Sequence, residues 1–372
     1  MDALDGAKLY CGAILGESCI ATGGDTNDAC VLYTDGIQRP SRLRGHSDYI
    51  NAVCAIATPP AGSKQDQWRV LTASADETVR VWDAAKAPGD GVLWRHVGIY
   101  DKHCGPVRSV CFMDDNGLCA ASAGGHDDLK VRIWRTDGLT KRVGGSMLSA
   151  CGAIVSSRRR PGALSGHTAP VESVCAVTPT LVASASLDET CRLWDAETSR
   201  EVATLRGHRR EALCVCAAYP MLVSSSDDRT VRCWDCRSAA TTHIFRGVHS
   251  GSIYAAQLDG EHRVVSGGAD GRLAAWDLRR AASGGETSCS GGADAIGARS
   301  SPLAVKESAH GIRACNKILA TDRPVSVGGA EAARLWSFGD DGCVRSWRLG
   351  GGAEGFVELT PHNGEAMACL GR

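Results

Sequence analysis

Histidine, serine and aspartate, the side chains that hydrolases combine for nucleophilic attack, recur together along this sequence. One set is His208, Ser224 and Asp228, and similar sets occur in at least five segments of the chain. An enzyme needs one active site that its substrate can reach. Because the set repeats, the sequence favours a structural role for it. No catalytic residue and no enzyme activity are predicted.

Cysteine is the second residue type that could do chemistry, and the chain has 18 of them. Many lie in apolar, strand-like runs, such as Cys54 in NAVCAI and Cys175 in ESVCAV. This placement favours buried, reduced thiols in a cytoplasmic or nuclear protein over a secreted disulfide framework. Cys233 and Cys236 form the only close C-x-x-C pair, and no second pair follows at zinc spacing, so no metal site is predicted. Gly-Gly pairs such as 267–268 lack the strand–loop–helix context of a phosphate-binding loop, so no cofactor is expected.

The charge balance argues against several classes of partner. The 372 residues include 41 Lys and Arg against 42 Asp and Glu, for a net charge of -1, and 43% are hydrophobic. Neither a nucleic acid nor a membrane surface is favoured by this balance. No apolar run reaches the length of a membrane span. The first ten residues contain Asp2 and Asp5 and lack the basic start of a secretory signal.

One pattern recurs along the chain: an apolar pair, small residues, Asp, an apolar–x–apolar triplet and Trp. Four copies end in Trp-Asp: LTASADETVRVWD at Asp83, VASASLDETCRLWD at Asp195, LVSSSDDRTVRCWD at Asp235 and VVSGGADGRLAAWD at Asp277. Two looser copies end at Trp134 and Trp347, and a seventh, CIATGGDTNDACVLYT, is interpreted with Tyr33 in the place of Trp.

A second marker, Gly-His before an apolar run, stands between the copies. It occurs at Gly45-His46, Gly166-His167 and Gly207-His208, with weaker versions at His103, His249 and His310. Each unit then contains short apolar runs separated by turn residues, and alternation such as V-R-V-W is the period-2 signature of a strand.

These residues resemble the WD-repeat family over nearly the whole chain. The resemblance implies four-stranded antiparallel blades packed around a channel, and seven Trp-type positions imply seven blades. We therefore expect an all-β, seven-bladed β-propeller forming one domain over residues 1–372. The blades are expected at approximately 1–45, 46–102, 103–166, 167–207, 208–248, 249–309 and 310–372.

The resemblance also implies a structural hydrogen-bond network, a tetrad of His, Ser or Thr, Asp and Trp, in each blade. A buried Trp N–H needs an acceptor, and a fully satisfied polar network stiffens a fold. The matching positions are His46, Thr72, Asp76 and Trp82; His167, Ser184, Asp188 and Trp194; His208, Ser224, Asp228 and Trp234; His249, Ser266, Asp270 and Trp276; and His310, Ser337, Asp341 and Trp347.

Two predicted blades depart from this pattern. In the third, His103, Ser122, Asp128 and Trp134 have a shifted spacing that we interpret as one inserted residue. The first has a turn, GGDTNDA, that is interpreted as lengthened, and no His precedes its first strand. KLYCGAIL and the C-terminal PHNGEAMACL compete for one strand position, so the closure of the propeller is left open.

Long insertions are expected on one face of the propeller. They are residues 58–67, between first and second strands, and residues 84–92, 136–163 and 279–304, after third strands. The third of these contains Arg158-Arg159-Arg160, interpreted as part of a solvated loop or, alternatively, as an acidic or phosphate contact or a localisation patch.

The opposite face, with short turns, is the expected partner-binding surface. Residues at the starts of first strands point there in this family, and Tyr and Arg are enriched among binding hot spots. The matching positions are Tyr49, Asn51, Arg108, Glu172, Glu211, Leu213, Tyr254 and Arg313.

The leading hypothesis for function is a non-catalytic scaffold or adaptor that binds other proteins or peptides, with no small-molecule substrate. The alternative is a substrate receptor of a cullin–RING ubiquitin ligase. It rests on two Trp-Asp-x-Arg boxes that look like the ligase-adaptor box of some propellers, with Asp235, Arg237, Asp277 and Arg279 as the candidate contacts.

Overall fold

Regular structure in this protein is almost entirely strand. The computed structural model describes residues 8–15, 19–33, 40–58, 67–86, 92–137, 139, 141–143, 146–148, 162–281, 301–325, 333–349 and 355–359. The one helix among them is the short α1 (Leu278–Ala281). The alternating runs that the sequence shows around each Trp are strands, as predicted.

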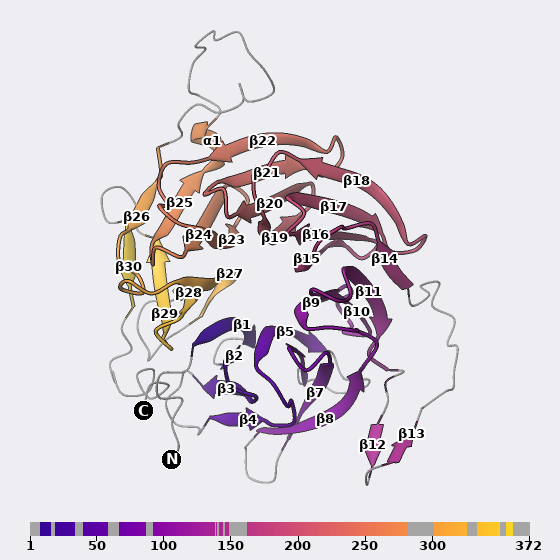
Figure 1. The fold of residues 1–372 in the computed structure, drawn as a ribbon. Helices are drawn as coiled ribbons and strands as arrows, with labels where there is room; N and C mark the ends of the chain where they lie inside the picture. The colour runs from indigo at the N-terminus through magenta and orange to yellow at the C-terminus, as the bar shows by residue number, and fades with distance from the viewer. Residues whose placement is uncertain are drawn as a thin grey trace. The chain divides into compact units, whose positions relative to one another are not determined.

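Seven four-stranded antiparallel sheets follow one another along the chain, and we number them blades 1 to 7 (Figure 1). Blades 1 to 3 comprise β1 (Leu9–Leu15), β2 (Cys19–Gly24), β3 (Ala29–Tyr33) and β4 (Ser41–Leu43); β5 (Ile50–Thr58), β6 (Gln67–Ser74), β7 (Val79–Lys86) and β8 (Val92–Tyr100); and β9 (Val107–Phe112), β10 (Cys119–Gly124), β11 (Lys130–Arg135) and β14 (Gly162–Ser165). Blades 4 and 5 comprise β15 (Val171–Thr178), β16 (Leu181–Ser186), β17 (Thr190–Asp195) and β18 (Arg200–Arg206); and β19 (Ala212–Ala218), β20 (Met221–Ser226), β21 (Val231–Asp235) and β22 (Ala240–Phe245). Blades 6 and 7 comprise β23 (Ile253–Asp259), β24 (Arg263–Gly268), β25 (Leu273–Asp277) and β26 (Ala304–Lys306); and β27 (Cys315–Val325), β28 (Ala333–Gly339), β29 (Val344–Leu349) and β30 (Phe356–Glu358). The predicted seven-bladed β-propeller is confirmed.

The chain forms two compact units, and the divisions between them fall within β1 and within blade 4. The N-terminal unit comprises Tyr10–Ser184 and Trp194–Val202, and the C-terminal unit comprises Met1–Leu9, Ala185–Leu193 and Ala203–Arg372. In each unit the apolar core lies between consecutive sheets. In the C-terminal unit, Val231 and Phe245 of blade 5 share one buried cluster with residues of blade 6. Burying one such side chain contributes about 1.5–3 kcal/mol, so sheet-on-sheet packing is the main stabilising interaction.

The predicted insertions are partly regular structure. β7 and β8 extend into the range 84–92, so the connection between them is shorter than expected. The insertion at 136–163 contains a separate hairpin of β12 (Lys141–Val143) and β13 (Ser146–Leu148). Residues 158–160, the basic triplet, lie outside the described residues.

Strand register corrects the assignment of Tyr33 in blade 1. In blade 2, Thr72 pairs with Arg80 and Trp82 pairs with Val70. In blade 1, Thr22 pairs with Cys30 and Leu32 pairs with Ile20. Leu32 therefore occupies the Trp position, and Tyr33 occupies the position of the following Asp. The separation from Thr22 to Cys30 equals that from Thr72 to Arg80, so the turn of blade 1 is not lengthened either.

The first strand of blade 1 comes from the N-terminal segment KLYCGAIL, which forms β1 beside β2. The side-chain amide of Asn316, in β27, donates to the backbone oxygen of Leu9 at 2.8 Å, and Lys8 pairs with Asp340 at 3.4 Å. The competing segment PHNGEAMACL lies outside the described residues.

Candidate protein-interaction surface

The tetrad of blade 5 is a continuous chain of hydrogen bonds. The indole N–H of Trp234 donates to Ser224 Oγ at 2.9 Å, which lies 2.8 Å from His208 Nε2, and His208 Nδ1 lies 3.0 Å from Asp228 Oδ2. Every group is satisfied when the serine hydroxyl donates to Nε2 and the Nδ1–H donates to the carboxylate. Burial lowers the pKa of His208 by more than Asp228 raises it, which keeps the imidazole neutral. Burial, the largest single influence, would raise the pKa of Asp228, but the interaction with His208 and the hydrogen bonds from Thr230 and the Arg209 backbone N–H together outweigh it and hold this pKa well below the usual range.

The same chain of bonds forms in blades 2, 3 and 7. The hydroxyl oxygen that joins His to Trp belongs to Thr72, Ser122 and Ser337, with His-to-hydroxyl distances of 2.8, 2.6 and 2.8 Å. Blade 3 forms its tetrad although Ser122 and Trp134 are 12 positions apart, against 10 for Thr72 and Trp82. Two residues are therefore inserted in blade 3, not one, and both lie in the turn.

Blade 4 joins His167 and Trp194 through Ser184. His167 Nε2 lies 2.8 Å from Ser184 Oγ, and the Trp194 N–H donates to the same oxygen at 2.7 Å. Asp188, the predicted fourth member, accepts the backbone N–H and the hydroxyl of Thr190 at 3.0 and 2.6 Å.

Blade 6 is the exception, because its tetrad lacks the Trp bond. His249 lies 2.8 Å from Ser266 and 3.0 Å from Asp270, as in the other blades. The N–H of Trp276, however, is buried and has no acceptor among the described residues. Its ring stacks on Phe245, with centroids 5.0 Å apart and planes at 20°. Trp276 is therefore a packing residue of the blade 5–blade 6 core and not a member of the hydrogen-bond chain, contrary to the sequence-based expectation.

These networks hold turns in place and cannot attack a substrate. Ser184, Ser224 and Ser266 are each 0% exposed, so no substrate reaches their hydroxyls. In blades 2, 3, 5, 6 and 7, the His–Asp bond fixes the loop before the first strand to the turn between the second and third strands. The result is a rigid frame for the loops beside it.

In the N-terminal unit, the four predicted binding residues differ in what they offer a partner. Tyr49 is 38% exposed, and its backbone oxygen accepts the Ser74 hydroxyl at 2.9 Å, which fixes its position. The Asn51 amide donates to the Val107 backbone oxygen at 2.9 Å and so joins blades 2 and 3. Arg108 and Glu172 form an ion pair at 3.6 Å, so a partner would meet these two as one neutral pair.

In the C-terminal unit, Tyr254 is 39% exposed and Arg313 is exposed, whereas Glu211 and Leu213 are half-buried. No hydrogen bond or ion pair is recorded between any two of these four described residues. Ile312, which the sequence reasoning missed, is 95% exposed beside Arg313. The sequence does contain a signal, an apolar residue directly after Gly311. The structure shows that Gly311 has a φ of 63°, which marks a tight turn.

The two Trp-Asp-x-Arg boxes have the same geometry. Arg237 donates to both carboxylate oxygens of Asp235 at 3.1 and 2.9 Å, and Arg279 does so to Asp277 at 3.0 and 2.8 Å. The hydrogen bonds from Arg237, first from its side chain, lower the pKa of Asp235 to about 2. The side chains of Arg237 and Arg279 remain 62% and 67% exposed, so each presents a fixed guanidinium.

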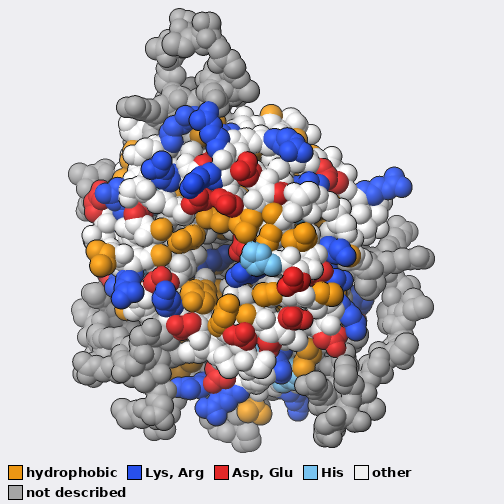
Figure 2. Space-filling view, in the orientation of Figure 1, with side chains coloured by type: hydrophobic (Ala, Val, Ile, Leu, Met, Phe, Trp, Pro, Cys, Tyr) orange, Lys and Arg blue, Asp and Glu red, His pale blue; other side chains and the backbone are white. Residues whose placement is uncertain are grey.

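Charge on the described surface is mixed. Figure 2 shows red, blue and orange side chains interspersed over the visible face. Within the described part of the chain, no group of three His, Cys, Asp or Glu side chains is placed to hold a metal ion. No described helix is long and apolar enough to cross a membrane.

Comparisons with known proteins agree with the fold. The model of the WD domain, G-beta repeat, matches residues 38–83, 94–135, 159–195 and 199–235. Nuclear distribution protein PAC1-2 of Uncinocarpus reesii is 33% identical over 202 residues, which cover 52% of this chain and 41% of that protein. Human WD repeat-containing protein 37 is 29% identical over 263 residues, covering 63% and 49%. The crystal structure of the RRP9 WD40 repeats superposes with a TM-score of 0.60 at 21% identity, covering 85% of this chain and 81% of that one.

The repeats, the blades and these matches define the class: the chain belongs to the WD-repeat family of β-propellers. It spans about half the length of the curated relatives that it matches first.

Proposed function

We propose that this protein is a non-catalytic scaffold that binds other proteins or peptides through the loops that lead into its first strands. The observation that carries the proposal is the exposure of large apolar side chains in these loops, Tyr49 at 38% and Ile312 at 95%, and at the start of the first strand β23, Tyr254 at 39%. Exposed aromatic and aliphatic anchors on a rigid frame are what protein interfaces use.

The partners are proteins or peptides, with neither a membrane nor a nucleic acid favoured by the net charge of -1. The compartment is the cytoplasm or the nucleus. This assignment is supported by the described cysteines, all of which carry free thiols, and by burial, which raises the pKa of Cys191 and Cys216 to about 12. Such thiols fit a reducing compartment.

The test is affinity purification with mass spectrometry on the intact chain and on an alanine variant of Tyr49, Arg108, Tyr254 and Arg313. We expect the variant to fold and to lose a defined set of proteins. The matched control is Val202→Ala, which removes an apolar side chain of 55% exposure from a fourth strand, β18. Identical partner sets for all three forms would refute a binding role for these residues.

A second candidate function is the substrate receptor of a cullin–RING ligase. The observation that favours it is the shared geometry of the two boxes, each with an exposed guanidinium held by its own Asp. Recovery of the ligase adaptor by the intact chain, with loss on Arg237→Ala and Arg279→Ala, is the expected result. Purification of the scaffold partners without any ligase adaptor rules out this candidate and leaves the scaffold proposal intact.

A further inference from the structure

The outer strands of the seven blades differ in how well their edges are protected. The fourth strand of each blade pairs on one side only, so its other side presents unpaired backbone N–H and C=O groups. Short strands and charged side chains discourage such an edge from pairing with another chain. β4, β14, β26 and β30 have three or four residues each, β18 carries two arginines and a glutamate, and β22 exposes only an alanine and a threonine. β8, the outer strand of blade 2, is the longest of the seven, with nine residues (Figure 1).

The first half of β8 has little of this protection. Val92 and Leu93 are 38% and 56% exposed, and the strand contains neither a proline nor an acidic residue. From Val92 to His96 the strand pairs regularly with β7, and the register shifts only beyond His96. No further described strand pairs with the other side of β8. We name residues 92–96 the β8 edge.

The second half of β8 is covered by the chain that follows β11. Gly98 and Ile99 are buried, and a Cβ atom on Gly98 would lie 2.6 Å from the Cβ of Leu139. Leu139 leads into the hairpin strand β12, which also contacts β8. The open part of the strand is therefore the β8 edge, whose length is close to the roughly five or six residues of a common strand.

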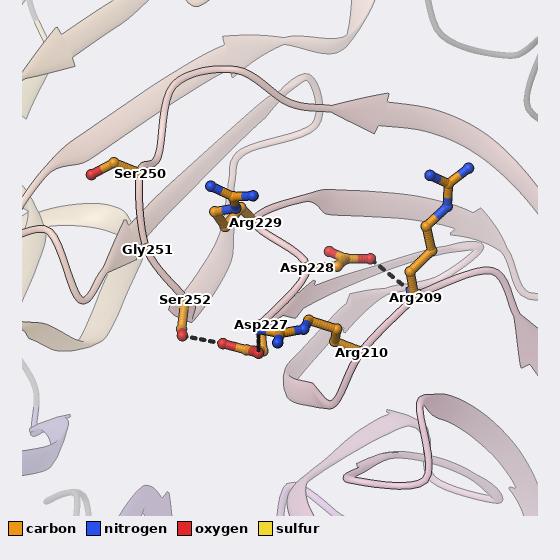
Figure 3. Close-up of a pocket in the computed structure, with 8 residues that line it drawn as sticks. All are labelled: Arg209, Arg210, Asp227, Asp228, Arg229, Ser250, Gly251 and Ser252. Carbon is orange, nitrogen blue, oxygen red and sulfur yellow. Dashed lines mark hydrogen bonds and ion pairs between the residues drawn. The ribbon is translucent and has the colours of Figure 1, made fainter.

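Arg95 gives the β8 edge a preference for negative charge. Its side chain is exposed, and no hydrogen bond or ion pair joins it to another described residue. Asp83 is its cross-strand neighbour, but both carboxylate oxygens of Asp83 already accept from Arg69, at 2.7 and 2.8 Å. The arginine of the β18–β19 loop in Figure 3 differs, because Arg210 is paired with Asp227. An acidic residue on a neighbouring strand would therefore give Arg95 the partner that it lacks.

We propose that the β8 edge binds an extended segment of a partner protein, which adds a fifth strand to the sheet of blade 2. About two or three of the edge residues turn their backbone N–H and C=O groups outward, and these groups bond to the main chain of the segment. Val92 and Leu93 project to opposite faces of the sheet, where apolar side chains of the segment cover them. An acidic residue of the segment pairs with Arg95. This inference goes beyond the scaffold function proposed above, because it uses a strand edge and not the loops that lead into first strands.

A second copy of this chain is favoured less as the occupant of the β8 edge. Its own β8 carries Arg95 and no acidic residue, so two copies paired here would leave both guanidinium groups without a carboxylate. A pairing confined to the β8 edge also falls far short of the roughly 20–30 residues that each side of a stable protein interface contributes.

The probe is a bead-bound library of short peptides in which threonine alternates with degenerate apolar positions around one fixed glutamate. A second library has lysine in place of the glutamate, and a third keeps the glutamate but has proline beside it. We expect the glutamate library to retain the intact chain about threefold or more above the lysine library, as an opposite-charge cross-strand pair predicts. The proline library should retain about fivefold less than the glutamate library, because proline has no N–H to pair with the β8 edge.

Two variants test the two chemical features of the β8 edge. Arg95→Glu should reverse the preference, so that the lysine library retains this variant better than the glutamate library does. A residue with a merely structural role would not exchange one preference for the other. Leu93→Ser should lower retention by about threefold, because it removes the apolar side chain that the segment covers. Val202→Ser is the matched control, since it makes the same kind of change at 55% exposure on β18 and should leave retention unchanged.

Several outcomes would overturn the proposal. They are equal retention on the glutamate and lysine libraries, an unchanged preference in Arg95→Glu, and undiminished retention by the proline library. Loss of retention in the alanine variant of Tyr49, Arg108, Tyr254 and Arg313 would assign the peptides to the loops instead. Elution of the intact chain as a dimer that Leu93→Ser converts to a monomer would assign the β8 edge to a second copy of the chain.

Discussion

Blades 5 and 6 offer a comparison that measures what the Trp bond adds to a tetrad. Ser224 joins both Trp234 and His208, whereas Ser266 joins only His249. Ser224→Ala leaves two buried groups without partners, the Trp234 N–H and His208 Nε2. Ser266→Ala leaves only His249 Nε2 newly unpaired, because the Trp276 N–H already lacks an acceptor.

Each buried group left unpaired costs about 1–3 kcal/mol. We therefore expect Ser224→Ala to lower the free energy of unfolding by about 2–6 kcal/mol and Ser266→Ala by about 1–3 kcal/mol. Both serines are 0% exposed and their blades share one apolar cluster, so the difference of about 1–3 kcal/mol reports the Trp bond.

Urea unfolding followed by tryptophan fluorescence measures both changes. The exposed Ser238→Ala is the control and should change stability by less than about 0.5 kcal/mol. Equal losses for Ser224→Ala and Ser266→Ala, or a larger loss for Ser266→Ala, would show that the missing bond in blade 6 is energetically irrelevant.

Three further outcomes follow from the contacts. Burial lowers the folded-state pKa of His103 and His208, so the unfolded chain takes up protons first below about pH 6.5, and the melting temperature should fall between pH 7 and pH 5. A flat profile over that interval contradicts neutral tetrad histidines. Arg69→Ala removes a paired contact with Asp83 at 2.7 and 2.8 Å and the bonds that join blade 2 to blade 3, so it should cost about 2–4 kcal/mol in urea unfolding. A loss below about 1 kcal/mol would mean that these bonds are worth no more than those of a surface pair. Cys104 is the exposed thiol among the described residues, so Cys104→Ala should remove one fast-reacting thiol in a titration of the native protein, and an unchanged count contradicts its exposure.

The blade count and most tetrads could be predicted from the sequence because their signals are local. Each tetrad needs particular side chains at nearly fixed spacing within one sheet. A Trp such as Trp82 or Trp234 therefore indicates where the third strand of its blade lies. In blade 1, the sequence-based prediction placed Tyr33 at the Trp position, which Leu32 occupies. The two residues are adjacent, and only strand pairing distinguishes them. The unpaired N–H of Trp276 has no sequence signal, because Ser266 and Trp276 are both present at the expected spacing and only the structure shows that they do not bond.

The candidate binding residues were harder to predict, because exposure and pairing depend on neighbouring sheets. Arg108 and Glu172 lie on different blades, and the sequence does not show that they pair.

Each tetrad draws its members from one sheet and the loop that leads into it, and no tetrad bond crosses to the next blade among the described contacts. Blade 1 has Leu32 at the Trp position and keeps the same strand pairing without a tetrad. Duplication of a gene segment that encodes such a unit therefore copies a complete tetrad with it. Later mutations can then remodel one blade and even remove its tetrad. The tetrads of the neighbouring blades continue to stabilise their own sheets.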